Sequence, residues 1–209
     1  MKSWTFFLFS AGASLAMAAD PTAPRIPPRA DAVPAFFPAN FSIEVQTEAD
    51  LNADGLDDSI AVVKSEDLRY LLVALREGKG LRRIRLGELD AYPLGNADLK
   101  VSAKKTLVLT DLTGGTSAFQ TVYRYRYESA ADRMRLIGLD VDFYSRTNAH
   151  GGLRRSYNYL TGETVGQDST LDAKGEYRFG KEQRHRGAPQ TIYLEDTPDP
   201  ADLVSGDRP

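Results

Sequence analysis

Apolar and polar residues alternate through the central part of the chain, between residues 41 and 195. The segment 41–46 (FSIEVQ) carries an apolar residue at every second position, which is the period of a strand with one buried face. Further apolar or β-branched runs occur at 60–63, 70–75, 81–86, 106–112, 119–127 and 134–144, with weaker ones at 157–160, 177–179 and 191–194. Glycines and polar clusters separate almost every pair. The pattern predicts roughly ten short strands and no long helix.

Short strands spaced by about 8–14 residues are typical of an all-β fold. We therefore expect an antiparallel meander that forms a sandwich or an irregular, propeller-like arrangement. A regular propeller blade needs about 40–45 residues, so residues 41–195 are too few for four blades. The open meander is the simpler expectation for this domain.

The two ends of the chain have a different composition. Residues 1–19 combine a positive start, a short apolar stretch and the small-residue sequence AMAA, which predicts a cleaved export signal. Residues 20–40 hold six of the eleven prolines and predict a semi-rigid, proline-rich linker. Residues 196–209 are polar with three more prolines, which predicts a flexible tail.

Composition narrows the compartment and the partners. The apolar run in residues 4–15 is too short to span ~30 Å of hydrocarbon, so we expect a periplasmic or secreted protein without a membrane anchor. The chain has no cysteine, which excludes disulfides, thiolate metal sites and a cysteine nucleophile. A formal net charge of −3 provides no global basic field, so nucleic acid is not an expected partner.

The strongest motif is the nine-residue segment 50–58 (DLNADGLDD). Oxygen-bearing side chains occupy its first, third, fifth and ninth positions, and Gly55 occupies the sixth. Calcium takes six to eight oxygen ligands, and glycine permits the sharp turn that brings alternate residues together. The predicted calcium ligands are Asp50, Asn52, Asp54, Leu56, through its carbonyl, and Asp58.

The surroundings of this segment distinguish it from an EF-hand. Position twelve is Ala61 rather than a glutamate, and strand-like segments lie on both sides. We therefore expect a calcium loop between two strands. A solvated Asp/Asn/Gly turn is the alternative interpretation, because these residues form such turns without a metal.

Other patterns leave two interpretations open. Tyr123, Tyr125 and Tyr127 alternate with arginines, which fits either a stacking surface for sugars or bases or a strand with one buried tyrosine face. Residues 113–117 (TGGTS) form either an anion cradle or a tight turn. His150 is one of two histidines, and no hydrolase motif accompanies it. No catalytic residue is predicted, and we do not expect an enzyme.

The segment 50–58 resembles the calcium loops of FG-GAP and VCBS repeats, in a single copy. Six other segments also contribute to a wider resemblance: RYLLV at 69–73, GKG at 78–80, 107–116, YRYRY at 123–127, LIGLD at 136–140 and 156–162. Together these segments resemble a family of exported proteobacterial proteins that includes immunity lipoproteins against peptidoglycan hydrolase effectors of type IV secretion systems.

This resemblance implies a propeller-like β fold, one calcium site at Asp50, Asn52, Asp54, Leu56 and Asp58, and inhibition of a lysozyme-like enzyme in the periplasm. The chain departs from the family because it has no lipobox cysteine. The resulting expectation is an exported calcium-binding protein that binds another protein, as an inhibitor or immunity protein of a peptidoglycan hydrolase. The first alternative is a sugar- or envelope-binding module that uses tyrosines 123–127 or 157–159, and a hydrolase ranks below it.

Overall fold

The computed structural model describes residues 25–205, so the export signal expected at 1–19 lies outside the described residues. The strands are β1 (Arg29–Ala30), β2 (Ser42–Ala49), β3 (Asp58–Lys64), β4 (Arg69–Glu77), β5 (Gly80–Leu89), β6 (Asp98–Val101), β7 (Thr106–Gly114), β8 (Ser117–Glu128), β9 (Arg133–Ser145), β10 (Leu153–Asn158), β11 (Glu163–Leu171), β12 (Tyr177–Phe179), β13 (Gln183–Arg186) and β14 (Ile192–Tyr193). Three short helical segments are η1 (Val33–Phe36), η2 (Leu194–Asp196) and α1 (Pro200–Ser205).

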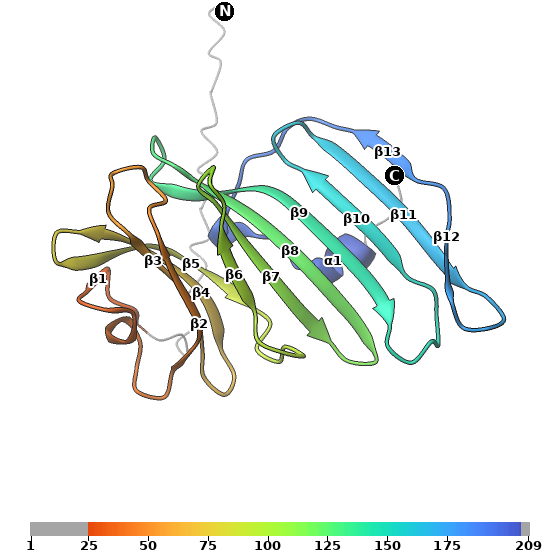
Figure 1. Ribbon diagram of the computed structural model, residues 1–209, viewed down its shortest axis with the longest axis horizontal. Helices are drawn as coiled ribbons and strands as arrows, with labels where there is room; N and C mark the ends of the chain where they lie inside the picture. Colours follow the sequence, from red (N-terminus) through yellow and green to blue (C-terminus); the bar gives the residue numbers. More distant parts are fainter. Residues whose placement is uncertain (1–24, 206–209) are drawn as a thin grey trace, which may run out of the picture.

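These strands form two antiparallel sheets in the described part of the chain (Figure 1). The first sheet has the order β1-β5-β4-β3-β2, and the second has the order β12-β11-β10-β9-β8-β7-β6. Strand β13 pairs with β11, and β14 pairs with β9. The all-β antiparallel meander predicted from the sequence is confirmed. The meander builds two packed sheets rather than propeller blades.

The main core lies between the two sheets. Ile60 and Val62 of β3 and Leu71 and Val73 of β4 belong to the same buried cluster as Leu109 of β7. The opposite face of β4 is also buried, which explains why its sequence RYLLVAL reads as a continuous apolar run. A strand buried on both faces needs a second covering layer.

The N-terminal segment supplies that layer, so the described part of the proline-rich linker predicted for residues 20–40 packs on the domain. Val33 and Phe36 of η1 are each only 1% exposed and pack on the outer face of β3 and β4. Strand β1 pairs with β5. The prolines restrict the backbone but do not remove the need to bury these apolar side chains, and Pro34 sits at the start of η1, where proline is tolerated.

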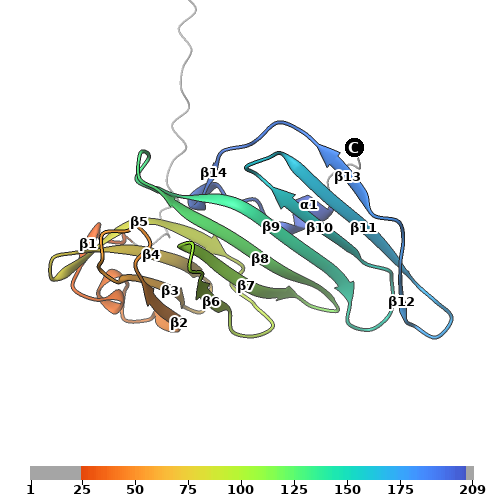
Figure 2. The ribbon, with the colours of Figure 1, turned by 45° about the horizontal axis from the view of Figure 1, so that its top comes forward.

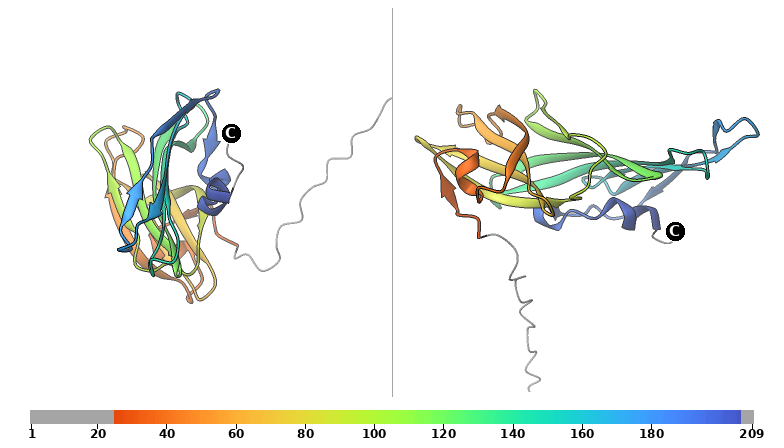
Figure 3. Two further views of the ribbon diagram at one scale, coloured as in Figure 1. Left: turned by 90° about the vertical axis from the view of Figure 1, so that its right-hand side faces the viewer. Right: turned by 90° about the horizontal axis from the view of Figure 1, so that it is seen from below.

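The C-terminal segment also packs on the domain, so the flexible tail predicted for 196–209 is wrong for its described part. We call residues 194–204 the C-terminal strap. Leu194 is 2% exposed, and Leu203 and Val204 pack against the main core. Figure 3 shows the strap and α1 lying against one face of the second sheet. A proline-containing stretch separates Leu194 from Leu203 and Val204. The spacing of these apolar residues therefore matches neither the strand period nor the helix period.

The second sheet extends beyond the area covered by the first (Figure 2). Strands β10 to β13 form this extension, and every residue from 178 to 190 is exposed. None of the helical segments in residues 25–205 has the length and apolarity needed to cross a membrane.

Candidate functional site

The predicted calcium loop connects β2 to β3, as expected. Ala49 at the end of β2 is paired with Asp58 at the start of β3, so residues 50–57 close the end of this hairpin. Ala53 and Gly55 have positive φ angles of 69° and 85°. These values curl the backbone into a compact loop, and Gly55 relieves the cost at the sixth position.

Side-chain oxygens hold this loop in place. Asp50 accepts the N–H groups of Ala53 at 2.7 Å and Gly55 at 3.1 Å. Asp54 accepts the N–H of Leu56 at 2.8 Å and the side-chain amide of Asn52 at 2.9 Å. The first, third and fifth positions of the motif are therefore organised by the loop's own backbone and by each other.

Asp58, the ninth position, lies at the buried end of the loop. It is 0% exposed, and its two oxygens accept the N–H groups of Leu51 at 2.8 Å and Arg76 at 2.9 Å. Burial raises the pKa of the Asp58 carboxyl; these N–H groups act against that change, while the charges of Asp54 and Asp50 add to it. Asp58 thus connects the loop to β4 through hydrogen bonds. The negative charges of Asp50 and Asp54 act on its carboxylate.

A lysine from the other sheet reaches the loop. Lys105, in the turn between β6 and β7, donates through Nζ to Asp50 Oδ2 at 2.7 Å and to the Asp50 carbonyl at 3.0 Å. This contact, with the N–H groups of Gly55 and Ala53, holds the pKa of the Asp50 carboxyl below its ordinary value. The ammonium group of Lys105 therefore balances part of the loop's negative charge.

The residues of the loop fit calcium in their chemistry. Every predicted donor is a carboxylate, amide or carbonyl oxygen, the donor type that calcium prefers. In residues 25–205 no group of three or more His, Cys, Asp or Glu side chains is gathered to hold a metal ion. Each carboxylate oxygen of Asp58 has two lone pairs, so its two N–H bonds leave capacity for a cation.

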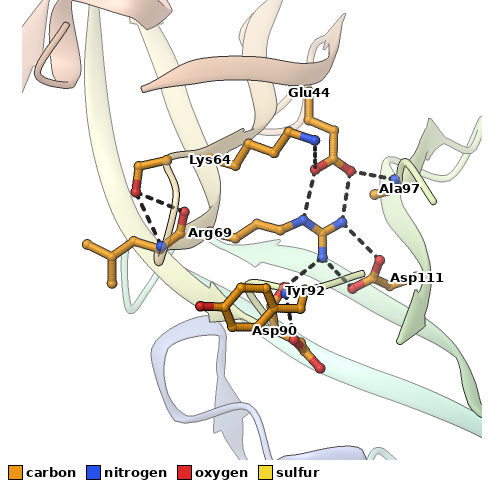
Figure 4. A network of polar contacts seen from close by, with 9 residues as sticks. Glu44, Lys64, Arg69, Asp90, Tyr92, Ala97 and Asp111 are labelled. Carbon is orange, nitrogen blue, oxygen red and sulfur yellow. Dashed lines mark hydrogen bonds and ion pairs between the residues drawn. The ribbon is translucent and has the colours of Figure 1, made fainter. Parts of the chain in front are cut away.

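A buried charge network lies at the other end of the β2–β3 hairpin from the loop and was missed by the sequence analysis (Figure 4). The Arg69 side chain is 0% exposed and makes paired hydrogen bonds of 2.8–2.9 Å to Glu44 of β2 and to Asp111 of β7. Its remaining donor bonds the Asp90 carbonyl at 3.2 Å. All five guanidinium N–H groups are satisfied, and the network joins the two sheets.

Glu44 is further held by groups around it. Its Oε1 accepts the N–H of Ala97 at 2.6 Å, and Lys64 Nζ lies 3.7 Å from Oε2. Burial alone would raise the pKa of the Glu44 carboxyl, but the bonds from Arg69 and Ala97 and the charge of Lys64 hold it below its ordinary value. In the sequence, Glu44 reads as an ordinary polar position of an alternating strand.

The structure brings His150 to the hydroxyl of Ser117, the last residue of the TGGTS segment. Ser117 Oγ lies 2.7 Å from His150 Nε2, and His150 Nδ1 bonds the Gly151 carbonyl. In the described part of the chain, Nδ1 thus has a carbonyl rather than a carboxylate as its partner. Gly114, the last residue of β7, has a φ of +95° and is paired with Ala118 of β8, so the TGGTS segment forms the tight turn between these two strands.

The tyrosines of β8 face the core. Tyr123 is 6% exposed and Tyr125 is 1% exposed, while Arg124 and Arg126 lie on the opposite face. The interpretation as a strand with a buried tyrosine face is confirmed. These two tyrosines offer no exposed stacking surface.

No family model matches the chain, and no curated protein or solved structure matches it.

Proposed function

We propose that this chain is an exported β protein that binds calcium through residues 50–58 and acts by binding another protein, a peptidoglycan hydrolase that it inhibits. The observation that carries the calcium part of the proposal is the conformation of the loop. Asp50 bonds the N–H of Gly55, and Ala53 and Gly55 take the positive φ angles that the curled loop requires. A bound ion would then fasten the β2–β3 hairpin and stabilise the scaffold.

Asp50, Asn52, Asp54 and Asp58 would hold the ion through side chains, and Leu56 through its carbonyl. Calcium would supply charge neutralisation here, because the charges of Asp54 and Asp50 already raise the pKa of Asp58. Lys105 supplies part of that neutralisation itself and competes with the ion for Asp50.

Replacing Lys105 with methionine is therefore expected to strengthen calcium binding several-fold, because it removes a cation from Asp50 and keeps the apolar stem of the side chain. Calorimetric titration of both proteins measures the change. Lys79→Met, in the exposed turn between β4 and β5, is the matched control and leaves the affinity unchanged. Weaker calcium binding by Lys105→Met would contradict the claim that Lys105 competes with calcium for Asp50.

Support for a protein partner comes from the loop between β9 and β10. Its residues 146–149 are exposed, yet the loop is held by its own bonds. Ser145 Oγ accepts the N–H of Ala149 at 2.9 Å, and the Tyr177 hydroxyl accepts the N–H of Ser145 at 2.7 Å. A pre-organised loop loses little conformational entropy when it enters a partner's cleft.

This loop gives the inhibitor proposal a direct test. Purified protein is added, in calcium, to lysozyme-type hydrolases digesting purified peptidoglycan, and slower release of soluble fragments is expected. Arg146→Ala should weaken inhibition without changing the melting temperature, whereas Arg178→Ala, an exposed arginine of β12, should not. Digestion at an unchanged rate with every hydrolase tested would overturn the inhibitor proposal but leave calcium binding untouched.

A further inference from the structure

A pocket of about 380 Å³ lies between the extension of the second sheet and the C-terminal strap. This volume falls within the ~300–1,000 Å³ usual for ligand pockets. Tyr157 of β10, Thr164 of β11 and His185 of β13 are paired in register across three strands and form its floor. Pro198 and Leu203 of the strap form the opposite wall.

Two stacked tyrosines dominate one end of this pocket. The rings of Tyr157 and Tyr159 lie 6.0 Å apart with only 10° between their planes. Tyr159 is 6% exposed, and no hydrogen bond to its hydroxyl is found within residues 25–205. The Tyr157 hydroxyl has only a long contact of 3.5 Å to the Leu203 carbonyl. Both hydroxyls therefore have hydrogen-bonding capacity left for a ligand.

The rest of the lining combines apolar and polar residues and has little free charge. Thr164, Gln190 and Asn158 contribute neutral donors and acceptors. The single carboxylate of the lining, Glu163, is engaged by Arg184 at 3.1 Å. The lining thus offers aromatic faces and neutral hydrogen-bonding groups, with no unpaired carboxylate to select a cation.

We infer that this pocket binds a neutral saccharide, at the scale of one or two pyranose rings of an oligosaccharide. The apolar face of a sugar ring stacks on Tyr157, and the ring hydroxyls bond the Tyr159 hydroxyl, Thr164 and Gln190. A sugar matches this lining because it presents apolar C–H faces and many neutral hydroxyls together. The site lies apart from residues 50–58 and does not depend on the calcium or inhibitor proposals.

The test is a calorimetric titration of the purified protein with chitotetraose, cellotetraose and maltotetraose, each in a separate experiment. Binding of at least one of them is expected in the millimolar range or tighter. Tyr159→Phe keeps the ring but removes the unpartnered hydroxyl, and should weaken binding about threefold to tenfold, the range for one lost hydrogen bond. Thr164→Val should act in the same direction.

Controls separate this site from a general effect on folding. Tyr92→Phe removes an exposed tyrosine hydroxyl outside the pocket and should leave the affinity unchanged. All variants are melted to confirm that they fold. No binding of any of the three oligosaccharides at 10 mM (roughly the weakest affinity of interest), or binding that Tyr159→Phe and Thr164→Val leave unchanged, overturns the inference. Preferential binding of a proline-rich peptide at this site would overturn it as well.

Discussion

Replacing Arg69 with methionine is expected to lower the free energy of unfolding by about 3–5 kcal/mol, the usual cost of breaking a buried ion pair from one side. The substitution keeps most of the side-chain volume but leaves the carboxylates of Glu44 and Asp111 without their shared partner. Because these carboxylates come from different sheets, the loss falls on the contact between the sheets. Urea unfolding measures the change.

The effect of Arg69→Met should depend on pH. The pKa of Glu44 is lowered in the folded protein from its ordinary value of 4.5, so its ionised form stabilises the fold above that pH. This contribution is lost as the pH falls through the folded pKa. In the variant, burial without Arg69 favours the neutral form of Glu44. The difference in unfolding free energy between wild type and Arg69→Met should therefore become smaller as the pH falls from 7 to 4.

The matched control is Arg124→Met, which removes an arginine from an exposed pair with Asp140 on β9. Exposed pairs contribute little, so a change within about 0.5 kcal/mol is expected. Equal effects of Arg69→Met and Arg124→Met would contradict the role assigned to the buried network.

Replacing Phe36 with alanine should cost about 3–5 kcal/mol, because it removes a fully buried ring from the layer over β3 and β4. Thermal melting monitors the loss. Phe179→Ala, at a side chain 41% exposed on β12, is the control and should have a much smaller effect. If Phe36→Ala melts at the wild-type temperature, the N-terminal segment is a linker after all, as its prolines suggest.

The strands could be predicted because their signals are local. The alternation at 41–46 lies at the start of β2, and the turn sequence at 77–80 joins β4 to β5 with Glu77 paired to Gly80. The N-terminal layer and the C-terminal strap could not be predicted in this way. Their buried residues are few, widely spaced and set among prolines, so only the surface that they cover gives them a fixed position.

The candidate sites likewise differ in whether a local sequence pattern could reveal them. The spacing of Asp50, Asn52 and Asp54 located the loop, because one short segment contains them. Lys105 reaches that loop from the other sheet, and no sequence pattern connects them. The Arg69 network likewise joins residues on three strands. A charged residue in an apolar run, as at Arg69, is the one local signal that could have indicated a buried ion pair.

The most direct test of the central claim is a calorimetric calcium titration of protein purified from cells that express the full chain. The account predicts one-to-one binding, abolished by Asp54→Ala. With a dissociation constant of ~0.1 mM, ~1 mM calcium would stabilise the fold by about 1.4 kcal/mol and raise the melting temperature. No heat of binding and an unchanged melting temperature in millimolar calcium would contradict it, and residues 50–58 would then be a metal-free turn.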